Sequence, residues 1–212
     1  MATKTQQNRL SAIGGEVPTS GGNFSIELQK PYRVEVTLEG VAPLLFHRWN
    51  CESVESKSKA KKGSAEKRND DLESYVYRTT SGELAVPGEY LRGALVGAAR
   101  YQADPRSPRK SSADLFKAGV ISLTSLAGLG VKAWDYIDKR RVCIQRNAVT
   151  RARPAMLEGW KATFVLQVQL PEYISQSLLN STIQAAGKLI GLADFRPSFG
   201  RFSIVQFSVL DD

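Results

Sequence analysis

Alternating apolar and polar positions predict several β-strands along this chain. Val34, Val36 and Leu38 alternate with polar residues between positions 33 and 39, as in a strand with one buried face. Apolar stretches at 75–78 and 83–86 flank Thr80-Ser81-Gly82, which predicts a hairpin. Four later segments are also predicted as strands: 120–126, 140–145, 162–170 and 200–210.

Two segments show the period of 3.6 that is typical of helices. After Pro87 and Gly88, apolar and small residues follow helical spacing as far as about Gln102. The small residues predict close packing against a sheet. Residues 173–190 form an amphipathic pattern, and Gly191 is placed to end that helix.

The main elements come in the order strand, helix, strand, strand, helix, strand. This order predicts an α+β domain with the ferredoxin-like (RRM-like) β-α-β-β-α-β core, which has two helices on one face of a sheet. In RNA-recognition motifs the open face binds single strands. Residues 1–23 are polar and predict a flexible N-terminal arm, so that 24–212 form a single domain. Residues 52–73 are almost devoid of apolar side chains and predict a surface insertion.

Composition adds a charge imbalance to this picture. The 212 residues include 29 Lys and Arg against 21 Asp and Glu, a formal net charge of +8. An excess of this kind attracts polyanions, of which nucleic acid is the usual one, although solubility alone is an alternative reason. Cys51 and Cys143 form no metal-binding or redox spacing. The N-terminal residues lack an apolar secretory core and no apolar run is long enough to span a bilayer, so we expect a cytoplasmic protein without a membrane partner.

The basic residues gather in four clusters in predicted loops and at strand ends. The first is Lys57, Lys59, Lys61, Lys62, Lys67 and Arg68, and the second is Arg106, Arg109 and Lys110. The third is Lys139, Arg140, Arg141, Arg146, Arg151 and Arg153, and the fourth is Arg196 and Arg201. Loops carried by a rigid sheet commonly bind ligands, and each cation that meets a phosphate adds salt-sensitive affinity. The third and fourth clusters are therefore the candidate nucleic-acid contacts, with a solvated surface as the alternative; the first is more typical of a solvated insertion.

Aromatic residues are interleaved with these cations, and such rings can stack on unpaired bases. Trp134 and Tyr136 lie in a less regular stretch and are the candidates for stacking. Trp160 and Phe202 are predicted in the core instead.

The segment 191–202, GLADFRPSFGRF, has the most distinctive composition. Gly191 and Gly200 bracket it, which permits tight turns and close approach of the backbone to a ligand. Arg196 or Arg201 would contact phosphate there. The alternative is a structural turn held by an ion pair between Asp194 and one of these arginines.

Catalytic patterns are weak in this sequence. His47 is the only histidine, and a single histidine more often packs or donates a hydrogen bond than catalyses. No paired-carboxylate, zinc-binding, phosphate-binding or dinucleotide motif is present. The sequence therefore predicts no catalytic residue, no metal and no cofactor.

The glycine-bracketed loop before the last strand resembles the repeat-associated mysterious protein (RAMP) superfamily, which includes backbone subunits of CRISPR effector complexes and phage-encoded relatives. The strand ending at Gly40, the loop 42–48 and the strand-to-helix entry 86–95 are similar to that family too. The resemblance implies a binder of single strands that polymerises along its ligand. It implies a thumb-like insertion at about 127–153 and a palm that includes Arg92, Arg196 and Arg201. No catalytic aspartate can be placed, which leaves cleavage unsupported.

These observations predict a non-enzymatic, largely sequence-independent binder of single-stranded RNA or DNA that forms a homo-oligomer or filament on its ligand. One alternative is a metal-independent endoribonuclease that uses His47. Another is a self-assembling structural or partner-binding protein whose charge is incidental.

Overall fold

A computed structural model describes residues 29–49, 59, 71–144 and 147–210, and for residues 142–144 and 147–149 it describes the backbone alone. Several predictions concern residues outside this description. They are the arm 1–23, most of the insertion 52–73, Cys51, Arg146 and, except for Lys59, the whole first basic cluster. Within the described part of the chain, no helix is both long and apolar enough to cross a membrane.

The centre of the fold is a four-stranded antiparallel sheet. Its strands lie in the order β12 (Phe202–Leu210), β1 (Tyr32–Gly40), β11 (Lys161–Val168) and β7 (Val120–Ser122). The alternation in β1 decides its two faces, because Val34, Val36 and Leu38 are fully buried while the residues between them are not. The predicted strand at 33–39 is thus confirmed in the middle of the sheet.

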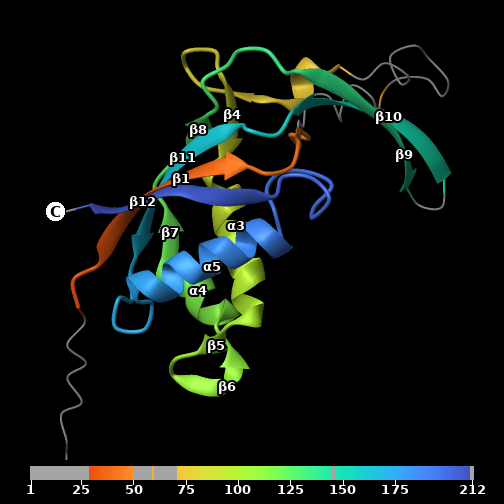
Figure 1. Cartoon of the computed structure of the whole chain (residues 1–212). Coiled ribbons are helices and arrows are strands. Elements are labelled where there is room, and N and C mark those ends of the chain that lie inside the picture. Colours follow the sequence, from red (N-terminus) through yellow and green to blue (C-terminus); the bar gives the residue numbers. More distant parts are fainter. Residues whose placement is uncertain (1–28, 50–58, 60–70, 145–146, 211–212) are drawn as a thin grey trace, which may run out of the picture.

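Helices cover one face of this sheet (Figure 1). They are α3 (Gly88–Ala98), which continues into the 3-10 helix η2 (Ala99–Tyr101), α4 (Ala113–Gly119) and α5 (Gln176–Leu189). The Ser175 side chain caps α5 by accepting a hydrogen bond from the Leu178 amide. Gly191 ends that helix at φ +79°, where its amide donates to the Ala186 carbonyl. One core joins the sheet to the helices, which confirms an α+β protein.

Smaller sheets surround the central one. The first contains β3 (Tyr77–Arg78), β4 (Leu84–Pro87) and β8 (Leu126–Gly128), preceded by the 3-10 helix η1 (Glu73–Tyr75). The second contains β2 (Leu44–Leu45), β10 (Asn147–Met156) and β9 (Tyr136–Ile144). The third is the hairpin of β5 (Ala103–Asp104) and β6 (Ser107–Ser111). In Figure 1 the β9–β10 hairpin projects away from the central sheet, and β5–β6 lies at the opposite end of the molecule.

Some predicted elements needed correction. The strand predicted at 120–126 is divided between β7 and β8, which belong to different sheets. The polar stretch 104–110 is a hairpin rather than a loop, because backbone pairing does not require apolar side chains. The strand predicted at 140–145 starts earlier, and its partner β10 was not predicted, since arginines and Pro154 interrupt the apolar pattern.

Candidate nucleic-acid interface

The segment between α5 and β12, residues 191–201, is called the terminal loop below. Gly200 has φ +71°, and a Cβ atom there would lie 1.9 Å from the Leu192 carbonyl oxygen. The Gly200 amide donates to the Pro43 carbonyl, and the Leu192 amide donates to the Gly200 carbonyl, both at 2.8 Å. The predicted need for glycine has a concrete reason: the backbone of the loop closes on itself.

Two residues of the terminal loop hold a backbone conformation that side chains disfavour. Ala193 has φ +59° and Phe195 has φ +58°, and Asp194 lies between them. The Asp194 amide donates to the Leu45 carbonyl at 3.1 Å, which ties this point of the loop to β2. Surrounding structure therefore holds the backbone of Asp194 in a fixed position, from which its side chain extends.

The Asp194 carboxylate joins three parts of the chain. Its Oδ2 lies 3.1 Å from Arg153 Nε on β10 and 3.4 Å from His47 Nδ1. The Arg153 side chain is only 7% exposed, so the Asp194 carboxylate is needed to compensate the buried positive charge of its guanidinium. Burial raises the pKa of Asp194, but His47, Arg153 and the Phe195 amide outweigh burial and hold that pKa below its usual value. The expected partner of Asp194 was Arg196 or Arg201, and the structure provides Arg153 instead.

His47 lies between this carboxylate and a second arginine. Its Nε2 is 3.4 Å from Arg151 Nη1, and its ring meets Tyr75 edge-on at 5.2 Å between centroids. The side chain is 32% exposed. The histidine is held on three sides and open on another.

The two faces of the β9–β10 hairpin divide the third basic cluster. Arg140 pairs with Arg151 and Asp138 with Arg153, so these four side chains share the face turned toward the terminal loop. Together with Tyr136, they are called the inner face below. Lys139 and Arg141 are exposed on the opposite face. Although several of these cations are neighbours in the sequence, they lie on two faces of the hairpin, because successive residues of a strand point to opposite sides.

Arg140 is engaged within the protein. Its Nη2 donates to Asp138 Oδ1 at 2.7 Å, and its guanidinium lies 4.8 Å from the Phe195 ring and 4.5 Å from the Phe199 ring. These contacts between the guanidinium and the two aromatic rings join the hairpin to the terminal loop. Arg140 and Arg153 therefore position the hairpin, and Arg151 has no carboxylate partner in the described part of the chain.

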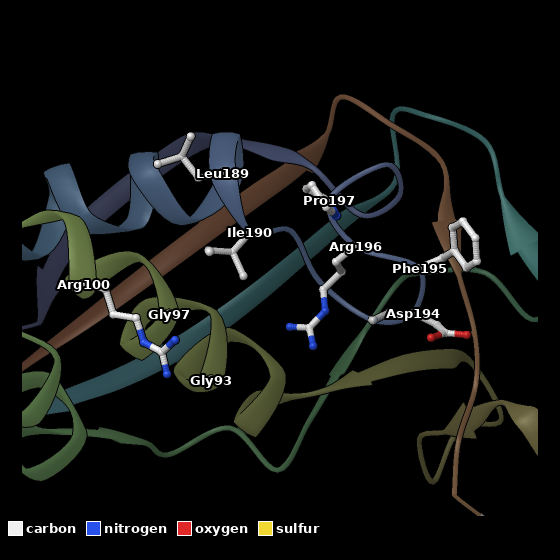
Figure 2. Close-up of a pocket in the computed structure, with 10 residues that line it drawn as sticks. Gly93, Gly97, Arg100, Leu189, Ile190, Asp194, Phe195, Arg196 and Pro197 are labelled. Atoms are coloured by element: carbon white, nitrogen blue, oxygen red, sulfur yellow. The ribbon is translucent and has the colours of Figure 1, made fainter. Parts of the chain in front are cut away.

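A groove of about 570 Å³ lies between α3 and the terminal loop. Gly93 and Gly97 of α3 form its floor, with apolar side chains from the end of α5 beside them. In Figure 2 Arg100 and Arg196 extend into this space, whereas the Asp194 carboxylate turns away from it. Both arginines are exposed, and neither is ion-paired among the described residues.

The other predicted contacts differ in their surroundings. Arg201, the last residue of the terminal loop, is exposed. Arg92 donates to the Val120 and Lys117 carbonyls and pairs with Glu89, so its groups hold α3 to the segment around β7. Trp134 packs half-buried against the main core, and Tyr136 packs against Leu45, Ala155 and Phe199.

The prediction that Trp160 and Phe202 belong to the core is confirmed, at 4% and 2% exposure. Trp160 Nε1 donates to the Ala42 carbonyl at 2.9 Å. Arg100 was not among the predicted contacts. Positions 93, 97 and 100 follow helical spacing, and that signal could have placed Arg100 above the two glycines.

The open face of the central sheet has a different chemistry. Glu35, Thr37 and Glu39 of β1 lie on this face, and Glu39 faces Lys161 at 3.7 Å. Thr37 and Thr163 share a hydrogen bond across the strands. The strand residues of this face, all within the described part of the chain, include no aromatic side chain. It lacks the stacking rings on which RNA-recognition motifs rely.

No family model and no curated protein matches the sequence. Among solved structures, the chain is similar to a chain of the Type III-B Cmr-beta complex, determined by cryo-electron microscopy while bound to cognate target RNA. The TM-score is 0.53 at 9% identity, and the similarity covers 85% of this chain. It covers 61% of that chain, so the present chain corresponds to less than two thirds of it. At such low identity the likeness establishes a shared fold.

Proposed function

We propose that this chain binds single-stranded nucleic acid, with RNA as the first candidate, and catalyses no reaction on it. The observation that carries the proposal is the pair Arg100 and Arg196, two exposed guanidinium groups that extend into the groove over Gly93 and Gly97 of α3. Guanidinium groups form paired hydrogen bonds with phosphate oxygens, and a glycine floor lets a backbone approach closely. Binding would depend on the phosphates and little on base sequence.

The arrangement of the core supports this proposal. The order β1, α3, β7, β11, α5, β12, together with the sheet order β12-β1-β11-β7, supports the expected ferredoxin-like core, and we propose on that basis that the chain is related to the RAMP superfamily. The similar chain comes from an RNA-bound complex. The β9–β10 hairpin would serve as the thumb expected at 127–153, and the groove would form the palm.

The binding path follows from the positions of unpaired cations. A strand that enters the groove between Arg100 and Arg196 passes the terminal loop. Beyond the loop lies the inner face of the hairpin, where Arg151 is the cation without a carboxylate partner among the described residues. The groove and the inner face would bind successive phosphates.

The test is a salt titration with fluorescently labelled single strands. Affinity for RNA and DNA oligonucleotides of equal length and mixed sequence is measured between 50 and 200 mM salt, with a duplex as the control. We expect the logarithm of the affinity to fall linearly with the logarithm of salt concentration. Affinity that does not respond to salt would contradict a backbone contact, and the RNA-to-DNA ratio identifies the preferred strand.

We also propose that several copies line up along one strand, because neighbouring copies add cooperativity to a short basic footprint. Light scattering with oligonucleotides of increasing length measures this directly. The mass of the complex should grow with ligand length. A single copy on every ligand would exclude assembly.

A second candidate function is metal-independent RNA cleavage at His47. It is favoured by the position of Asp194 at His47 Nδ1, which would orient the ring. Nε2 could accept a proton only after Arg151, whose Nη1 lies 3.4 Å from it, moves onto the RNA phosphate. Nε2 would take the proton of a ribose 2′-hydroxyl, the 2′-oxygen would attack phosphorus, and the bond to the 5′-oxygen would break as that oxygen takes a proton from water. Incubation with RNA in a metal chelator tests this. A 2′,3′-cyclic phosphate product that disappears in His47→Gln would establish cleavage, whereas intact RNA supports the binding function alone.

A further inference from the structure

Trp49 is, with Tyr101 at 69%, one of the two most exposed large apolar side chains among the described residues. It is 70% exposed, whereas Trp160 is 4% exposed and Trp134 is half-buried. An isolated exposed apolar side chain is ordinary on a protein surface. The position of Trp49 within the fold is what distinguishes it.

The backbone that leads to Trp49 is firmly held. The Phe46 amide donates to the Pro154 carbonyl at 3.0 Å, and the Arg48 amide donates to the Tyr75 carbonyl at 2.8 Å. Phe46 itself is buried in the main core. The backbone before Trp49 is therefore fixed by hydrogen bonds to two other segments. The exposure of the indole is not the result of an unattached stretch of chain before it.

The side chains before Trp49 belong to the candidate interface. His47 contacts Asp194 and Arg151, and the Arg48 guanidinium lies 5.1 Å from the centre of the Tyr77 ring. Two residues of chain span at most about 7 Å, so the indole begins within that distance of His47. Neither Arg48 nor Arg151 is ion-paired with a carboxylate in the described part of the chain.

We propose that Trp49 stacks on an unpaired base of the bound strand, while Arg151 and Arg48 face the phosphates that flank it. This inference rests on the proposed function and adds a base contact to it. An exposed indole that is adjacent in the chain to Arg48, and two residues from the histidine that Arg151 contacts, matches the chemistry of one nucleotide, which has an apolar ring face and a charged phosphate. The stack tolerates any base, because every base has a flat ring face. Trp49 thereby takes the role that the sequence assigned to Trp134 and Tyr136.

The test compares Trp49→Ala with the wild-type chain on two ligands. One is a single-stranded oligonucleotide, and the other has the same backbone but abasic sugars. We expect Trp49→Ala to weaken binding of the normal strand by roughly 5- to 100-fold and to leave binding of the abasic strand unchanged. Trp49→Phe should recover part of the affinity, and Trp49→Leu should recover less, because leucine has no ring to stack.

Intrinsic fluorescence gives a second readout. Stacking on a base should quench Trp49 emission, so added strand should quench the wild type and Trp134→Phe but no longer quench Trp49→Phe. Melting temperature checks that each variant is folded, and an exposed side chain is not expected to change it.

The outcomes separate this inference from the proposed function. Wild-type protein that binds neither strand at low salt would overturn both. Equal affinity of Trp49→Ala and wild type for the normal strand would overturn stacking and leave the binding function in place. An equal loss on normal and abasic strands, or a loss of self-association with affinity unchanged, would also overturn stacking and assign Trp49 to another contact.

Discussion

The open face of the central sheet and the interface around the terminal loop both carry charged residues, but they balance charge differently. On the open face, Glu39 lies opposite Lys161, and threonines fill the positions between. At the interface, Asp194 neutralises Arg153, while Arg100, Arg151 and Arg196 have no carboxylate partner among the described residues. The comparison teaches that a net charge of +8 does not by itself locate a binding surface, because it is the local balance of cations and acids that differs between the two regions.

The largest expected effect comes from reversing charge in the groove. The double substitution Arg100→Glu and Arg196→Glu should weaken single-strand binding by at least about 10-fold at low salt, because two phosphate contacts become repulsive. Fluorescence anisotropy measures the affinity.

The control for this prediction is Lys161→Glu, which makes on the open face the same charge change that each of the two groove substitutions makes by itself. It should weaken binding by less than about 3-fold, through long-range repulsion that salt screens. If Lys161→Glu has the larger effect, the strand runs over the open face, and our comparison of the two regions is reversed.

The next effect concerns the stability of the interface itself. Asp194→Asn leaves the buried Arg153 charge without compensation, and we expect the free energy of unfolding to fall by ~1–3 kcal/mol. Because the folded protein lowers the pKa of Asp194, the wild-type contribution is present well above pH 4 and is lost as pH falls through that lowered pKa. Chemical unfolding at several pH values should show the wild type and Asp194→Asn converging in acid. A constant difference at every pH would mean that the charge of Asp194 is unimportant.

Filling the groove should have a smaller effect. A Cβ atom at Gly93 would meet nothing within 4 Å, so Gly93→Ala should stabilise the protein by ~0.5–1 kcal/mol as the helix gains a better former. Gly93→Leu should fold equally well but weaken binding by about 5-fold, because its side chain occupies the floor of the groove. Melting temperature and affinity are measured on both variants. Unchanged affinity of Gly93→Leu would remove the α3 floor from the binding path.

The smallest effect is expected at the edge of the terminal loop. Arg201→Ala should leave the melting temperature unchanged, since Asp194 pairs with Arg153 and His47 instead. If Arg201 meets phosphate, affinity should fall by about 2- to 5-fold and the salt slope should decrease by about one unit. A lower melting temperature with wild-type affinity would return Arg201 to a purely structural role.

Several elements of this fold could be predicted because their signals are local. The burial of Val34, Val36 and Leu38 follows from a period of two, and the end of α5 follows from a glycine at Gly191. Alternation and helix termination depend on neighbouring residues, so a single sequence contains the necessary information. The excess of positive charge and the need for glycine at Gly200 could be inferred on the same basis.

The assembly of the candidate interface could only be decided by the tertiary structure. Asp194 meets Arg153 and His47, which are 41 and 147 residues away along the chain, and no local pattern connects them. The sequence grouped Arg140, Arg151 and Arg153 with Lys139 and Arg141, but the pleat of a strand pair separates them onto two faces, and packing on Phe195 and Phe199 engages Arg140. The exposure of Trp49 and the burial of Trp160 likewise follow from the contacts around each ring. Composition and periodicity therefore determined which residue types this protein has and which elements they form, while long-range packing decided which cations remain unpaired and available to a ligand.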